Sequence, residues 1–256
     1  MNGEIEQMSR IVCCVRKALY TNNDIVFTPS KYVLSIKFVF SSPFVLWKTI
    51  KANSVEAWYD ICQNRGLCDI KFLIPAETKQ RHLLGFANTS QGALVCFWKN
   101  GKASYFVPVW DFDSKRNGWN ICYREQRNVT ISKDVFSYSN KIEEFKSVLI
   151  DIGSFAEKIG FPYFSDVFHK AYEGLHDFAK IDEYNVPEHI PNELKGIYYA
   201  VETADVFGAM GSWNDSPPCY AEQMGLGNEY NKLSDRLFKQ LRYHLMYVTN
   251  QCWQKD

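Results

Sequence analysis

The apolar positions of the first twenty residues recur at helical spacing. Ile5, Met8, Val12 and Val15 lie three or four residues apart, so they share one face of a helix. The pattern predicts an amphipathic helix over 5–19 that buries this face. A second, shorter stripe predicts a helix from Val55 to Cys62 that stops at Gly66, because glycine favours helix ends.

Other stretches of the first half show the two-residue period of apolar positions that is typical of strands. The runs DIVFTPS and YVLSIKFVF predict a hairpin over 24–40, and CDIKFLIP predicts a buried strand. Four further runs, separated by turn residues, predict an antiparallel meander: LLGFAN, ALVCFWK, ASYFVPVW and GWNICYRE. The pair Asn100-Gly101 predicts a two-residue type I′ turn inside this meander, since both residue types tolerate positive φ.

After residue 140 the apolar residues again follow a helical period. The stripes predict four helices, which cover about 142–159, 165–178, 194–207 and 230–252. The stretch 208–228 then becomes a connection of roughly twenty residues between two helices.

Together these patterns predict an α+β protein in which a mainly meander, antiparallel sheet from the N-terminal half packs with a C-terminal set of about four helices. Residues 1–137 carry 18 basic and 11 acidic side chains, and residues 138–256 carry 11 basic and 18 acidic ones. We expect a single domain over 1–256, made of a β-rich basic half, 1–137, and a helical acidic half, 138–256.

The composition and the first residues indicate in which cellular compartment the protein is expected. No apolar run approaches the ~20 residues of a membrane span, and the first residues, MNGEIEQMSR, are acidic and polar where a signal peptide is basic and then apolar. We therefore expect a cytoplasmic protein with no membrane partner. The eight cysteines are expected to be reduced there, and their spacings match no common zinc site.

The motifs that would identify an enzyme class are absent. The chain lacks G-x-S-x-G, G-x-x-x-x-G-K-[ST] and a G-x-G-x-x-G that opens a helix. His169, Glu173, His176 and Asp177 could share one helix face and bind a metal, but a solvated face beside an apolar stripe explains them more simply. We therefore expect no catalytic residues, no metal and no cofactor.

The connection 208–228 is the most informative stretch for function. Loops of this length within a domain are usually functional or disordered, and its aromatic residues argue against disorder. The candidate residues for binding a partner or a ligand are Met210, Ser212, Trp213, Asn214, Asp215 and Tyr220. In the simpler alternative, Trp213 fills the core of its own domain and the two polar residues after it cap the loop.

The favoured hypothesis is a non-catalytic intracellular protein that binds another protein through this connection, as an inhibitor, an immunity-type protein or an accessory subunit. One alternative is an enzyme with an unfamiliar pocket here that uses Asp215 and Asn214. The other is single-stranded nucleic-acid binding by the aromatic and basic sheet, which requires an exposed Trp98 or Trp110. Nucleic acid is the less favoured partner because the net charge is zero, and the oligomeric state is not predicted.

Overall fold

The computed structural model of the chain describes residues 2–41, 50–76, 81, 88, 91–127, 131, 133–139, 141–181, 187 and 189–253. The chain divides into two compact units. The sheet unit comprises Gly3–Ile74, Ser90–Ser137 and Thr249–Asp256, and the helical unit comprises Met1–Asn2, Pro75–Thr89 and Tyr138–Val248. The change from β-rich to helical sequence at 137/138 coincides with one boundary between the units. That both units unfold as one cooperative domain stays a prediction.

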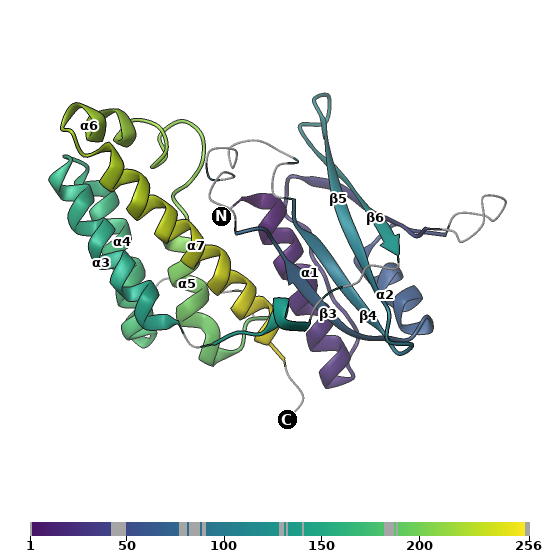
Figure 1. The fold of residues 1–256 in the computed structure, drawn as a ribbon. Helices are drawn as coiled ribbons and strands as arrows, with labels where there is room; N and C mark the ends of the chain where they lie inside the picture. The colour runs from purple at the N-terminus through teal and green to yellow at the C-terminus, as the bar shows by residue number, and fades with distance from the viewer. Residues whose placement is uncertain are drawn as a thin grey trace. The chain divides into compact units, whose positions relative to one another are not determined.

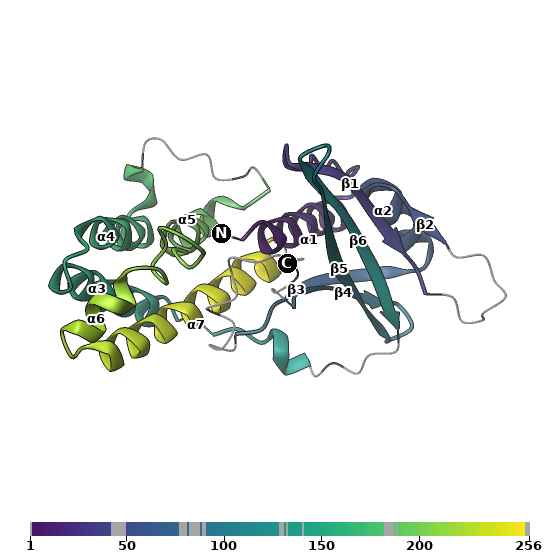
Figure 2. The same ribbon diagram turned by 90° about the horizontal axis from the view of Figure 1, so that it is seen from above.

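The sheet unit holds a six-stranded mixed sheet in the order β2-β1-β6-β5-β4-β3. Strands β3 to β6 are labelled in Figure 1, and all six are labelled in Figure 2. The strands are β1 (Val33–Val39), β2 (Lys51–Ala52), β3 (Leu67–Leu73), β4 (Ala93–Trp98), β5 (Ala103–Asp113) and β6 (Gly118–Arg127). Strands β3 to β6 form an antiparallel meander. The predicted strand LLGFAN lies, except for Asn88, outside the described residues.

Strand β1 corrects the prediction of an antiparallel sheet. It pairs in parallel with β6, more than eighty residues later in the chain, and antiparallel with the short β2. Residues 24–30 form no strand, so the predicted hairpin over 24–40 is wrong. Pro29 lacks the N–H that a ladder needs, whereas Phe38 finds an aromatic partner in register, Tyr123 on β6.

The turn at Asn100-Gly101 also differs from the prediction. Gly101 has a φ of +77°, but Asn100 is not among the residues with positive φ, so the turn is not type I′. The Gly101 N–H donates to the Trp98 carbonyl at 2.9 Å and the Trp98 N–H donates to the Lys102 carbonyl at 3.0 Å. These bonds define a three-residue loop that closes on a left-handed glycine.

Two helices supply the core of the sheet unit: α1 (Gly3–Thr21) and α2 (Val55–Asn64), both near their predicted bounds. The Phe38 ring stacks on Trp58 of α2 at 4.5 Å and on Tyr123 at 4.8 Å. Gln7 of α1 donates to the Tyr123 hydroxyl at 3.2 Å. Because Phe38 and Tyr123 are paired neighbours on one face of the sheet, both helices pack on that face.

The helical unit contains α3 (Ile142–Lys158), α4 (Pro162–His176), α5 (Lys195–Ala204), α6 (Pro217–Gln223) and α7 (Gly227–Gln251), whose last residues belong to the sheet unit. Helices α3, α4, α5 and α7 have 17, 15, 10 and 25 residues and are the four long helices of this unit, and Figure 2 labels each of them. All four match predicted helices. The helix α6 was missed, so the described residues hold seven α-helices in all, five of them after residue 137.

Helix α6 overturns the prediction of an unbroken connection over 208–228. Pro217 occupies its first turn, where the missing N–H costs nothing and the fixed φ suits a helix. The two consecutive prolines, Pro217 and Pro218, therefore begin a helix. Among the described residues, no helix combines the length and the apolar character needed to cross a membrane.

Candidate functional site

The candidate residues of the 208–228 segment have separate environments. Trp213 is fully buried and packs edge to face on Phe164 and Phe168 of α4, with ring centroids 5.2 and 5.5 Å away. Its Nε1–H donates to the Ser234 hydroxyl of α7 at 2.8 Å, and its carbonyl accepts from the Tyr230 hydroxyl at 2.7 Å. Trp213 therefore fills the core of the helical unit, as the simpler alternative expects.

The polar residues around Trp213 hold the local backbone. The Asn214 amide donates to the Arg81 carbonyl at 2.9 Å and accepts from the Arg81 guanidinium at 3.2 Å. Asp215 accepts the Gly211 N–H at 2.9 Å, and the Ser212 hydroxyl accepts the Asn214 N–H at 3.2 Å. These contacts hold the backbone of the connection near Trp213.

Three large apolar side chains of the 208–228 segment are exposed. Met210 is 94% exposed, and Tyr220 and Met224 of the α6 region are 52% and 51% exposed. Tyr220 and Met224 stand four residues apart, so they share one face.

A residue at the N-terminal end of α4 contacts Tyr220. The Tyr220 ring meets Phe161, the residue that precedes α4, edge to face at 5.2 Å. Tyr163, two residues later, is 70% exposed. We call the set Phe161, Tyr163, Tyr220 and Met224 the α4–α6 surface.

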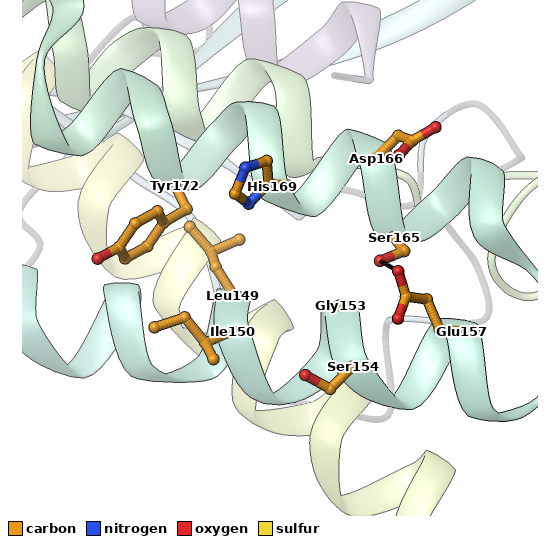
Figure 3. A pocket seen from close by; sticks show the side chains of 9 residues that line it. All are labelled: Leu149, Ile150, Gly153, Ser154, Glu157, Ser165, Asp166, His169 and Tyr172. Carbon is orange, nitrogen blue, oxygen red and sulfur yellow. Dashed lines mark hydrogen bonds between the residues drawn. The ribbon is translucent and has the colours of Figure 1, made fainter.

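A pocket of about 340 Å³ lies between α3 and α4, which places it in the usual size range of ligand pockets, near the lower limit (Figure 3). It is lined by Leu149, Ile150, Gly153, Ser154, Glu157, Ser165, Asp166, His169 and Tyr172. Gly153 is the lining residue at which α3 comes close to α4. A Cβ built there would meet the Phe168 Cβ at 3.7 Å and the Ser165 Oγ at 3.8 Å, which are ordinary contacts.

The two ends of the α3–α4 pocket differ in chemistry. Leu149, Ile150 and Tyr172 lie at one end, and Glu157 and Ser165 lie together at the other. Asp166 is on α4 near that end, with its carboxylate directed away from Glu157 (Figure 3). The buried Ser165 hydroxyl donates to a Glu157 carboxylate oxygen at 3.3 Å. Two of the nine lining residues are carboxylates and none is Lys or Arg, so the polar end is acidic.

Contacts on α4 involve three of the four residues that could share a metal-binding face. His169 Nε2 lies 3.3 Å from Glu173, and the Tyr172 ring stacks against both His169 and His176 at about 6.5 Å. Asp177 lies beyond the last turn of α4, as its C-cap residue. Over the described part of the chain, no group of three His, Cys, Asp or Glu side chains is placed to hold a metal ion.

Sequence reasoning missed Glu157, Asp166 and the pocket between them. The only available signal was Gly153 in the middle of an otherwise strong helix stripe, because such a glycine often marks a close approach or an open position.

The sheet buries both tryptophans of which the nucleic-acid alternative requires at least one on the surface. Trp98 and Trp110 are each only 8% exposed, and Trp98 donates from its indole to Ser104 within the core. Comparison of the chain with protein families, with curated proteins and with solved structures finds no match.

Proposed function

We propose that this protein binds another protein, a basic one, through the α4–α6 surface of its helical unit. The observation that carries this proposal is the concentration of exposed apolar side chains there. Tyr163, Tyr220 and Met224 are each more than half exposed although they come from two different helices. Contiguous apolar patches on an otherwise polar surface mark interaction sites, and aromatic residues and methionine are enriched in them.

The charge of the helical unit supports a basic partner. Its ranges contain 12 Lys and Arg and 18 Asp and Glu, a net charge of −6, whereas the sheet unit has 17 and 11, a net charge of +6. Acidic surfaces attract basic partners and repel acidic ones, which increases the rate of encounter and the specificity.

The enzyme alternative has no comparable support. It requires Asp215 and Asn214 to face a substrate, but both side chains bond to the backbone of their own unit.

Affinity capture tests the proposal. The tagged full chain and a Tyr163→Ala/Tyr220→Ala variant are incubated with a lysate of the organism from which the chain comes, and any captured protein is purified and titrated by calorimetry. We expect a basic protein that binds the wild type and binds the variant at least about tenfold more weakly, since buried tyrosines dominate many interfaces.

The matched control is Val26→Ala/Val109→Ala, which truncates two exposed apolar residues of the sheet unit. All three proteins are first compared by thermal unfolding. A partner that binds the two variants equally well contradicts the proposal. Self-association of the wild type that the tyrosine variant abolishes, seen by sedimentation, would identify a second copy as the occupant and also contradict it.

A further inference from the structure

We infer that the α3–α4 pocket receives an arginine side chain of the protein partner. This inference rests on the proposed function and names the group that the helical unit recognises. An arginine combines a three-carbon apolar stem with a planar cation, and the two ends of the pocket match these two parts.

The apolar end suits the stem. Leu149 forms a buried floor, Ile150 is half exposed at the wall, and Tyr172 adds an aromatic side. Methylene groups gain free energy when they leave water for such a surface. An aromatic side chain also attracts a guanidinium that passes over it.

The acidic end suits the guanidinium. Glu157 of α3 and Asp166 of α4 both line the pocket. In Figure 3 the Glu157 carboxylate lies beside Ser165, and the Asp166 carboxylate points away from it. Ser165 bonds to one Glu157 oxygen, and a carboxylate has about four acceptor positions, so this bond leaves capacity for a ligand. A guanidinium presents five N–H donors in a fixed plane and can donate two of them to one carboxylate such as that of Glu157.

The pocket and the α4–α6 surface are continuous along α4. Tyr163 and Asp166 are three residues apart, as are Asp166 and His169, so these three side chains follow one exposed face of the helix. One partner could therefore cover the apolar patch and place an arginine in the pocket.

The experiment uses two short probes that differ only in charge. Acetyl-Ala-Arg-Ala-amide and its citrulline analogue, which is neutral, are titrated into the ¹⁵N-labelled full chain and followed by NMR. We expect the arginine peptide to shift the amide signals of Gly153, Ser154 and Ser165 with a dissociation constant on the order of 1 mM. The citrulline peptide should bind at least about tenfold more weakly, because it cannot form charge-assisted bonds.

Two variants locate the site. Glu157→Gln/Asp166→Asn should weaken the arginine peptide about tenfold, since each lost charge-assisted bond contributes to affinity. The control Glu143→Gln/Glu193→Gln removes two exposed carboxylates outside the pocket, so it changes the net charge of the unit equally and should alter affinity less than about twofold. Ser154→Leu narrows the pocket at constant charge and should also weaken binding.

The outcomes separate this inference from the proposed function. Equal binding of both peptides, or equal weakening in the pocket variant and the control, overturns the inference. So does a natural partner whose binding is lost in Tyr163→Ala/Tyr220→Ala but kept in Glu157→Gln/Asp166→Asn, and in that case the proposed function stands. A partner weakened by both double variants supports both.

Discussion

The sheet unit and the helical unit each bury an arginine, and the two side chains use different acceptors. Arg16 of α1 pairs with Asp69 and donates to three backbone carbonyls, those of Ile70, Cys252 and Trp253. These acceptors tie the residues that follow α7 to the sheet unit.

Arg81 of the helical unit bonds instead to side chains. It donates to Asp235 at 3.1 Å, Asn231 at 3.1 Å and Asn214 at 3.2 Å, and lies over the Phe207 and Tyr230 rings. Arg81 belongs to the segment 75–89, which ends 49 positions before the next segment of its unit begins at Tyr138.

The comparison shows how two units made of interleaved segments are held together. In each unit, a buried arginine holds a segment that is distant in sequence. The groups that accept hydrogen bonds from the arginine determine how much stability is lost when it is replaced. A buried backbone carbonyl that loses its donor remains in the interior without a hydrogen bond. An exposed side chain can instead rotate into solvent and be hydrated.

Replacing each arginine by methionine tests this difference most directly. Arg16→Met should lower the free energy of unfolding by about 4 kcal/mol, because Asp69 and buried carbonyls lose their donor. Arg81→Met should cost about 3 kcal/mol, because Asp235 is 39% exposed and can be hydrated. Urea unfolding of the full chain measures both, and a larger loss for Arg81→Met would break the comparison.

Acid should weaken the helical unit through one histidine. His244 of α7 stacks on Phe145 at 4.7 Å, and burial lowers its pKa from 6.5 to about 4. The unfolded chain protonates His244 at a higher pH than the folded chain does. The stability that depends on a neutral His244 is therefore fully present above pH 6.5 and is lost as the pH falls toward 4. The loss amounts to about 3 kcal/mol.

The variant His244→Phe keeps the ring contact and removes the titration. The unfolding free energy of the wild type minus that of the variant should therefore fall by about 3 kcal/mol between pH 7 and pH 4. Parallel curves would show that His244 does not contribute to the pH dependence.

A fully buried tryptophan in each unit gives the next contrast. The Trp213 indole N–H donates to Ser234, whereas the Trp58 indole N–H has no acceptor in the described part of the chain. Trp213→Phe should cost about 2–3 kcal/mol, because it removes atoms from the core and leaves a buried hydroxyl without its partner. Trp58→Phe should cost about 1 kcal/mol less, and equal losses in urea unfolding would contradict this account.

Replacing either of two glycines by alanine should have the smallest effects on stability, and the two effects should have opposite signs. A Cβ at Gly92 of the sheet unit would lie 2.5 Å from Met8 and 2.9 Å from Ile74, so Gly92→Ala should destabilise by about 1 kcal/mol or more. The room at Gly153 of α3 should let Gly153→Ala stabilise the chain by up to about 1 kcal/mol, because alanine favours helices. Shifts in thermal midpoint measure both, and a stabilising Gly92→Ala would show that the sheet unit is not packed more tightly at this position.

The hydrophobic pattern alone determined the local elements. The four long helices of the helical unit, both helices of the sheet unit and the strands β3 to β6 are present near their predicted positions. These elements follow from residues close in sequence, because a period of 3.6 or 2 decides which side chains can share a buried face.

Only the tertiary structure decided which distant segments meet. It paired β1 with β6, placed Arg81 in the helical unit, buried Trp213 and turned Pro217 into a helix start. Each outcome depends on contacts across many residues, which a one-dimensional pattern does not contain. The α3–α4 pocket has the same origin, since Glu157 and Asp166 line one cavity only because two helices pack side by side with Gly153 between them.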